Sequence, residues 1–459
     1  MAGDIWSVRA LTPLFPKLYE ARSDLSVAPD LAAALPAISA DGLTWTVRLR
    51  KAQWSPDGRP ITAADVVYTV KTEMDSTLAS TARFDWSPLA SVEAAGSRTV
   101  VFELKRPDAA FLGDQLTMAV VPSHELAATP PRDMAAALYS TQPSVAGGPF
   151  QLEVRVPGQS IDLEPNKRYY GGAPYLGGVQ IQVIGSSSAL ADQLTQGLVG
   201  WAPDISTAAA AALGGAPNVT LRRFPELGRF ALVFNERSGR PFADAAIRRN
   251  IAAGIDRRRV AAAAGGVAVW SDFNAASWAY DATASTGAQP EHETAGRLLY
   301  PLGDASRARA AAELVRELPG LTPDAVPPGD FQQRLAAGDF DVALAGLGEG
   351  VDPDPATAVA SWETPASNPL GENFGAYADR AVDGLVQRDL QLDPSDHAAR
   401  KAVLRDLERQ LDADPPFVDL WTVDEIDAFS STLAGVGAVG PQLDQDLQSS
   451  FYARWSLAA

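Results

Sequence analysis

The chain contains no cysteine, which excludes a disulfide framework, a thiolate nucleophile and a thiolate metal site. Histidine is nearly as scarce. Only His124, His292 and His397 occur, and none has a second histidine three or four residues away, the spacing by which imidazoles share a metal on a helix. We therefore expect no bound metal and no other cofactor.

Long apolar stretches are also missing. No run of about 18 apolar residues occurs, so the sequence predicts no conventional transmembrane helix. Residues 1–20 show neither the basic region nor the apolar region of a signal peptide. The sequence as it stands predicts either a trimmed mature protein or one that is not exported.

Basic residues are outnumbered, with 38 Lys and Arg against 56 Asp and Glu and a formal net charge of -18. Nucleic acid is therefore excluded as a partner, because phosphate binding needs clustered basic side chains. The 459 residues, 46% of them hydrophobic and 20% charged, are typical of a globular protein of roughly two to four domains.

Residues 43–70, LTWTVRLRKAQWSPDGRPITAADVVYTV, predict a strand, a tight turn and a capped helix. Trp45, Val47 and Leu49 alternate with polar residues, as in a strand with one buried face. A Pro-Asp-Gly turn at 56–58 follows. Thr62 and Asp65 then form a capping-box pattern, and the apolar stripe of the helix behind it is made of Val66, Val70 and Met74.

The amino-acid sequence of this block resembles the signature of the extracytoplasmic solute-binding proteins that serve oligopeptide, dipeptide and nickel ABC importers (family 5). Four further blocks resemble the same family in the same order: residues 99–107, 147–170, 230–257 and 338–377. The resemblance covers most of the chain.

The resemblance implies an α/β, two-lobed periplasmic-binding-protein-like fold of the large type, with an extra inserted domain and a hinge between the lobes. Lobe 1 is expected at 1–35, 144–225 and 437–459, the inserted domain at 36–143, and lobe 2 at 226–436. Lobe 2 is expected to be shortened near 319–338, where only a segment rich in proline and glycine separates a helix from the next strand. One βα unit is expected to be missing there.

The implied function is capture of a short peptide or peptide-like metabolite between the lobes, by a monomer that delivers it to an ABC permease complex. An extracytoplasmic location follows if the chain is trimmed, and a cytoplasmic one if it is not. Two alternatives stay open. One is a degenerate binding protein that acts as a sensor or biosynthetic accessory, and the other is a non-peptide ligand such as a sugar, a siderophore or a metal chelate.

An acidic loop at 347–355, LGEGVDPDP, follows an apolar strand, and open α/β sheets present ligand groups at such strand ends. In peptide-binding relatives a loop Asp pairs with the ligand's α-ammonium group. Counting back from Asp352 and Pro353, that position falls on Glu349. Asp352 is a second ligand candidate, although Asp352 and Asp354 are equally suited to capping a helix that follows.

Aromatic residues crowd the segment 270–280, which resembles the family's loop into the cleft. Trp278 and Phe273 are the first candidates for covering a ligand, although either ring could belong to the core. Trp362 could line the same pocket or pack a helix. Asn373 matches a family Asn and has a structural role as its alternative.

An enzyme is disfavoured. The chain has no G-x-S-x-G elbow, no P-loop and no H-E-x-x-H motif, and paired carboxylates are expected by chance among 56 acids. We therefore expect binding without catalysis.

Overall fold

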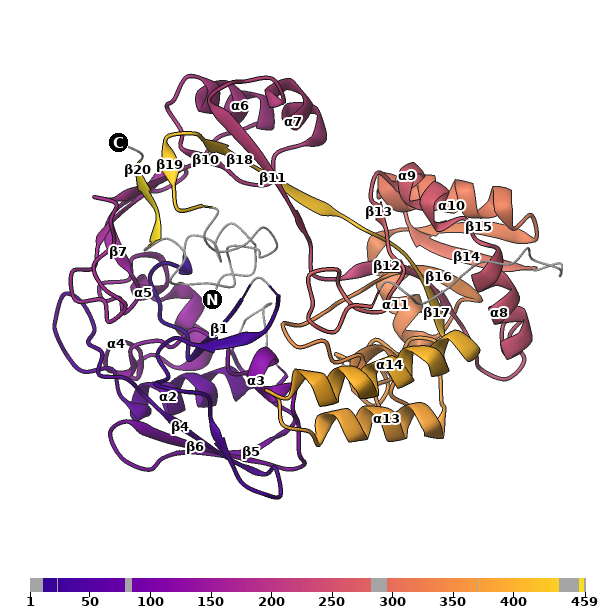
Figure 1. Ribbon diagram of the computed structural model, residues 1–459, viewed down its shortest axis with the longest axis horizontal. Coiled ribbons are helices and arrows are strands. Elements are labelled where there is room, and N and C mark those ends of the chain that lie inside the picture. The colour runs from indigo at the N-terminus through magenta and orange to yellow at the C-terminus, as the bar shows by residue number, and fades with distance from the viewer. Residues whose placement is uncertain are drawn as a thin grey trace. The chain divides into compact units, whose positions relative to one another are not determined.

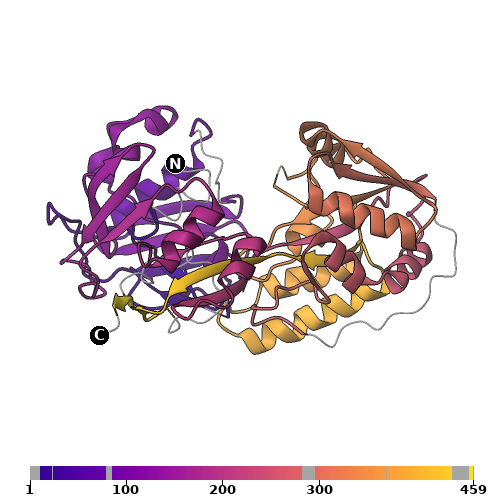
Figure 2. The same ribbon diagram turned by 90° about the horizontal axis from the view of Figure 1, so that it is seen from above.

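The structure is a computed structural model that describes residues 11–22, 24–78, 85–281, 295–368, 370–436 and 454–457. It divides into two compact units (Figure 1, Figure 2). Unit 1 comprises Met1–Phe224 and Glu425–Ala459, and unit 2 comprises Pro225–Asp424. The chain therefore passes between the units twice. In the described part of the chain, no helix has the length and apolar character needed to span a membrane.

Unit 1 is built from small sheets and short helices. Its four-stranded sheet has the order β3 (Ala37–Ile38), β4 (Thr44–Arg48), β6 (Thr99–Leu104), β5 (Leu89–Ala94). Two three-stranded sheets have the orders β7 (Phe150–Val156), β8 (Ser160–Pro165), β9 (Val179–Gln182) and β10 (Trp201–Ala202), β18 (Asp424–Ser430), β11 (Val219–Pro225). Two-stranded pairs join β1 (Tyr19–Ala21) to β2 (Val27–Pro29) and β19 (Leu433–Ala434) to β20 (Ser456–Leu457).

The helices of unit 1 in the described residues have between 4 and 12 residues. They are α2 (Ala63–Met74), α3 (Phe111–Asp114), α4 (Ser123–Leu126), the 3₁₀ helix η1 (Pro131–Ala136), α5 (Leu138–Thr141), α6 (Ser187–Thr195) and α7 (Thr207–Leu213).

The predicted strand, turn and helix at 43–70 are confirmed. β4 buries Trp45 and Val47 and leaves Thr44 and Thr46 partly exposed. The turn contains Gly58 with φ of +75°, a conformation that glycine adopts without strain. At the start of α2 the backbone N–H of Thr62 donates to the Asp65 carboxylate over 2.8 Å, as the capping box requires. Met74, expected on the buried stripe, is 44% exposed because α2 ends there.

Unit 2 contains one six-stranded sheet. Its order is β13 (Val267–Ala268), β17 (Phe417–Thr422), β12 (Arg229–Phe234), β16 (Val342–Leu347), β14 (Gly296–Pro301), β15 (Leu321–Val326). β14 runs parallel to β15 and β16, while β12 runs antiparallel to β16 and β17. The carboxyl ends of β14, β15 and β16 therefore share one edge with the start of β12.

Seven helices accompany this sheet in the described residues. They are α8 (Ala245–Gly254), α9 (Arg257–Ala264), α10 (Ala305–Glu317), α11 (Pro328–Ala337), α12 (Ala356–Val359), α13 (Arg380–Leu390) and α14 (His397–Ala413). Leu232, Leu344 and Leu420 of the sheet share a core with Ile251 of α8 and Leu314 of α10. α13 and α14 form a pair that packs side by side (Figure 1).

Two features of unit 2 differ from expectation. Residues 319–338, expected to lack a βα unit, form the strand β15 and the helix α11. Residues 425–436, expected in lobe 2, belong to unit 1 because β18 pairs with β10 and β11.

Candidate functional site

The acidic loop and the aromatic segment meet at the carboxyl edge of the sheet in unit 2. Glu349 lies two residues beyond β16, and both of its carboxylate oxygens accept the backbone N–H of Asn274 at 3.0 Å. The side chain of Asn274 in turn donates to the carbonyl oxygen of Glu226 at 2.8 Å. Two segments that lie 75 residues apart in sequence are thereby joined at Glu349.

The backbone beneath this contact leaves no room for larger residues. A Cβ at Gly228 would lie 2.9 Å from the carbonyl oxygen of Leu347, and Gly228 has φ of +101°. The N–H of Gly348 donates to both carboxylate oxygens of Glu372, at 2.9 and 3.0 Å. The backbone of residues 347 and 348, just before Glu349, therefore contacts Gly228, which precedes β12, and Glu372 on another segment.

The environment of Glu349 favours its neutral form. Burial raises the pKa of Glu349 to about 7, although the charge of Arg229 and the Asn274 N–H lower it, and the charge of Asp419 raises it further. The carboxyl group is thus near its midpoint at neutral pH. A ligand ammonium group would stabilise the charged form.

Arg229 is the cation at the centre of this cluster. It opens β12, and its Nε donates to Asp419 Oδ1 of β17 over 2.6 Å, with both side chains nearly fully buried. The guanidinium also lies over the ring of Phe417, 5.4 Å from its centroid. Burial, the Asp419 charge and a hydrogen bond to Asp419 hold the pKa of Asp272 well above its ordinary value, and Arg229 offsets this only in part.

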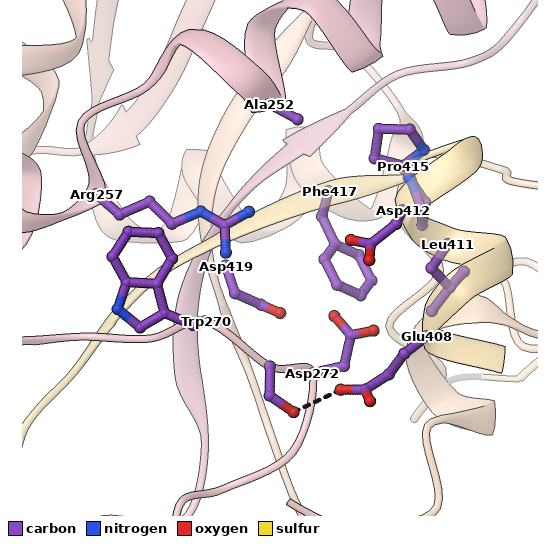
Figure 3. Close-up of a pocket in the computed structure, with 12 residues that line it drawn as sticks. Ala252, Arg257, Trp270, Asp272, Glu408, Leu411, Asp412, Pro415, Phe417 and Asp419 are labelled. Atoms are coloured by element: carbon purple, nitrogen blue, oxygen red, sulfur yellow. Dashed lines mark hydrogen bonds between the residues drawn. The ribbon is translucent and has the colours of Figure 1, made fainter. Parts of the chain in front are cut away.

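A cavity of about 40 Å³ adjoins these acids (Figure 3). The carboxyl groups of Asp272, Asp419, Glu408 and Asp412 converge on it, and Figure 3 shows Arg257 beside them. Its other lining residues are Ala252, Trp270, Ser271, Leu411, Pro415, Pro416 and Phe417. Burial raises the pKa of Glu408 and of Asp412 as well. The cavity is large enough for one or a few water molecules.

The two predicted aromatic residues of this region have different surroundings. Phe273 is 2% exposed and packs with Ala279 and with Leu404 of α14. Trp278 is half-buried, stacks on His397 with ring centroids 4.3 Å apart, and lies 5.2 Å below the guanidinium carbon of Arg400. The structure thus places Phe273 in a core and leaves part of Trp278 accessible.

Asp352 and Asp354 also differ in role. The carboxylate of Asp352 forms two 2.6 Å hydrogen bonds with the guanidinium of Arg400, which also binds Asp389. Asp354 accepts the N–H of Ala356, the first residue of α12, but the N-cap position is Pro355 and α12 has no side-chain cap, so neither acid caps this helix. The side chain of Asp352 therefore anchors the loop to α14 rather than capping α12.

The remaining two candidates lie after the acidic loop. Asn373 is 2% exposed, its amide donates to the carbonyl oxygens of Ala360 and Tyr377, and its oxygen accepts the Tyr377 N–H. These bonds give it a structural role. Trp362 is half-buried, and its buried indole N–H has no acceptor among the residues that the structure describes.

Arg229, Asp272 and Asp419 were not selected from the sequence. A signal was present for Asp419, because a lone acid within the apolar strand FVDLWT must be paired if that strand is buried. Its partner lies 190 residues away, and sequence alone does not reveal it. In the described part of the chain, no group of three or more His, Cys, Asp or Glu residues is arranged to hold a metal ion.

Comparison with known proteins gives one family. Residues 26–317, more than half of the chain, match the family described as bacterial extracellular solute-binding proteins, family 5 Middle. Protein XP55 of Streptomyces lividans is 28% identical over 90% of this chain and 79% of its own length. The oligopeptide-binding protein AppA of Bacillus subtilis is 31% identical over 40% of this chain and 34% of AppA.

Solved structures show the same fold. HbpA2 from Haemophilus parasuis has a TM-score of 0.84 at 18% identity, covering 100% of this chain and 97% of its own. AppA from Bacillus subtilis, in complex with a nonapeptide, has a TM-score of 0.71 at 20% identity, covering 100% of this chain and 95% of its own. The two-lobed α/β fold of these binding proteins is therefore the fold of this chain.

Proposed function

Because the chain belongs to family 5 of the bacterial extracellular solute-binding proteins, we propose that it captures a short peptide or peptide-like metabolite and delivers it to an ABC importer. The relative AppA is named an oligopeptide-binding protein, which supports a peptide as the ligand. An extracytoplasmic location, a monomeric state and a permease partner complete the proposal. The division of unit 1 into a lobe and an inserted domain at 36–143 is part of it.

The observation that carries the proposal is the placement of Glu349. This carboxyl group lies at the carboxyl edge of the sheet, is fixed by the Asn274 N–H, and has a pKa of about 7. A charge-assisted hydrogen bond from a ligand ammonium contributes about 1.5 to 3 kcal/mol. The carboxyl groups of Asp419, Asp272 and Glu349 share the single positive charge of Arg229, which favours a cationic ligand group over an anionic one at this point.

Trp278 is the aromatic residue that we propose to cover the ligand, because part of its ring is accessible. Trp362 joins it in the proposal, since its indole N–H has no acceptor among the described residues. Asp352, Phe273 and Asn373 make packing contacts and hydrogen bonds that hold the segments of the site in place. Binding of this kind needs no covalent step, and we propose no catalytic activity.

A peptide screen tests this function. Di- to pentapeptides are screened by thermal shift, and the best binder is compared with its N-acetylated form. We expect binding peptides to raise the Tm, since a ligand that binds only the folded state stabilises it. Acetylation should weaken binding roughly 10- to 100-fold.

Glu349→Gln should remove the difference between the free and the acetylated peptide. The matched control is Glu153→Gln, which changes an exposed carboxylate on β7 of unit 1. The proposal is wrong if every peptide leaves the Tm unchanged while a sugar or a siderophore raises it.

A further inference from the structure

Asn274 contacts two separate segments of unit 2 at once. Its backbone N–H donates to both carboxylate oxygens of Glu349 at 3.0 Å, and its side-chain Nδ2 donates to the carbonyl oxygen of Glu226 over 2.8 Å. The residue itself is buried, with 7% of its surface exposed. One residue therefore joins the candidate ligand-binding acid to Glu226, which directly follows β11.

A short turn fixes the side chain of Asn274 relative to its own backbone. Its Oδ1 accepts the N–H of Ala276 at 2.9 Å, and its carbonyl oxygen accepts the N–H of Ser277 at 2.8 Å. The turn occupies the side-chain oxygen and leaves the Nδ2 donor for Glu226. The backbone N–H and the side-chain Nδ2 of Asn274 therefore belong to one rigid group.

The two links between the units are bonded to each other at Glu226. The first link is residues 226–228, between β11 and β12, and the second is Val423, between β17 and β18. The backbone N–H of Glu226 donates to the carbonyl oxygen of Val423 over 3.0 Å. An unbroken series of hydrogen bonds therefore runs from the carboxyl group of Glu349 through Asn274 to both links.

The strength of the first bond in this series depends on the charge of Glu349. A hydrogen bond to an ionised carboxylate is roughly twice as strong as one between neutral groups. A ligand ammonium group keeps a carboxylate ionised, whereas proton binding neutralises it. Either event changes how firmly the N–H of Asn274 is held and, through the turn, how firmly its Nδ2 holds Glu226.

We propose that Asn274 is a positioning residue that transmits the charge state of Glu349 to the two links between the units. Ionised Glu349 holds the links more firmly, and neutral Glu349 holds them less firmly. For ligands this inference rests on the proposed function, because it needs an ammonium group at Glu349. For protons it needs no ligand, and burial, which raises the pKa of Glu349 to about 7, places the change near neutral pH.

Several other ionisable groups share the electrostatic environment of Glu349. They are Arg229 of β12, Asp419 of β17, Glu408 of α14, and Asp272 and Glu372 of the neighbouring loops. The carboxyl groups among them also titrate, so a pH profile of the wild type alone does not identify Glu349. Each experiment therefore includes Glu349→Gln, which removes only this titration.

Amide hydrogen exchange at Glu226, measured by NMR on the full chain, tests the coupling. Protection is expressed relative to the intrinsic exchange rate at each pH. At about pH 8.5 we expect Glu349→Gln to reduce the protection of this amide roughly 3- to 10-fold, because the link is held by a weaker series of bonds. At about pH 5.5 the two proteins should be equally protected, because residue 349 is neutral in both.

Asn274→Ser separates this coupling from simple structural support. Serine keeps an oxygen that can accept the N–H of Ala276 but lacks the amide donor. We expect the effect of Glu349→Gln on exchange to disappear in this background. The matched control is Asn218→Ser in unit 1, because Asn218 also donates from its side chain to a backbone carbonyl oxygen, over 3.1 Å. A Glu349 effect that persists in Asn274→Ser, or that is absent from the wild type, overturns the role of Asn274.

A second measurement leaves Asn274 intact. Its side-chain amide signals are followed by NMR as the pH is raised, together with the carboxyl carbon signal of Glu349. We expect both to shift with the same midpoint, near pH 7, and the amide shift to be lost in Glu349→Gln. Amide signals that stay constant, or that shift equally in Glu349→Gln, overturn the coupling even if Asn274→Ser does not fold.

The ligand form of the inference is tested with the best peptide of the thermal-shift screen. At about pH 5.5 the saturating free peptide should protect the Glu226 amide roughly 3- to 10-fold more than its N-acetylated form does, and this difference should vanish in Asn274→Ser. If peptides bind but exchange at Glu226 is the same with both, transmission from the ligand is overturned while the proposed function stands. If no peptide binds, the proposed function fails, and the two proton experiments still decide the role of Asn274.

Discussion

Arg229 supplies one positive charge to a group of carboxyls that includes Asp419, Asp272 and Glu349. If all three were ionised, two negative charges would remain uncompensated in a buried place, which is costly. The site therefore retains protons at neutral pH, as the raised pKa values of Asp272 and Glu349 indicate. Ligand affinity and protein stability should both depend on pH through these residues.

The stability effect of Glu349 has a definite sign. Its pKa is about 7 in the folded protein and 4.5 as an ordinary glutamate, so the folded state keeps this proton to a higher pH than the unfolded state. Stability is then lost as pH rises from about 4.5 to about 7, by at most about 3 kcal/mol. Relative to Glu349→Gln, the wild type should lose stability over this range in urea unfolding experiments. A difference between the two proteins that does not change with pH would contradict this.

At the scale of elements, α14 contacts both candidate ligand-binding segments, the acidic loop at 347–355 and the aromatic segment at 270–280. Arg400 binds Asp352 of the acidic loop and lies over Trp278 of the aromatic segment. Lys401 donates to the carbonyl oxygens of Trp278 and Tyr280, at 3.0 and 2.8 Å. Two consecutive residues of one helix therefore contact both loops.

Arg400→Met should destabilise the protein by about 3 to 5 kcal/mol, because it leaves Asp352 and Asp389 buried without their cation. Hydrogen exchange should accelerate in residues 270–281 and 347–355 more than in the strands of the sheet. The control is Arg409→Met on the same helix, where the side chain is 74% exposed. Equal acceleration everywhere would mean that Arg400 stabilises the whole unit and does not position these loops in particular.

Local patterns predicted some elements well and misjudged others. The alternation at Trp45 and Val47 predicted β4, and the Thr62–Asp65 pattern predicted the start of α2. In contrast, β15 was missed because Pro323 argues against a strand. Among the described strands β15 pairs only with β14, and an edge strand tolerates a proline, which has no N–H to donate to a second neighbour.

The candidate site was predicted only in part, because local sequence patterns do not show which distant segments pair. Glu349 and the segment 270–280 were selected from sequence, and the structure joins them through Asn274. The cluster of Arg229 with Asp419 depends on the pairing of β12 with β17, which no local pattern encodes. Asp419 lies inside the apolar strand FVDLWT, a pattern that calls for a buried partner, but only the fold identifies that partner as Arg229.

At the scale of the whole molecule, unit 2 is one continuous stretch of chain, while unit 1 is assembled from two. All six strands of the large sheet and both ligand segments lie within 225–424. A unit of this length with its own core has the size of a domain that folds independently.

We expect the isolated fragment 225–424 to unfold cooperatively in urea and to keep the amide of Asn274 protected by Glu349. NMR spectra of the fragment and of its Glu349→Gln form would test this, since only the Asn274 region should shift. A fragment that binds hydrophobic dyes and gives poorly dispersed spectra would show that unit 2 depends on unit 1.

Gly346, the exposed residue of β16, also offers a position at which ligand binding can be monitored. The chain has no cysteine, so Gly346→Cys would carry its only thiol, at an exposed site next to Arg307 and three residues from Glu349. An environment-sensitive dye attached there would sense the arrival of a ligand by a change in emission. The residue with no side chain thus marks where a reporter group can be installed.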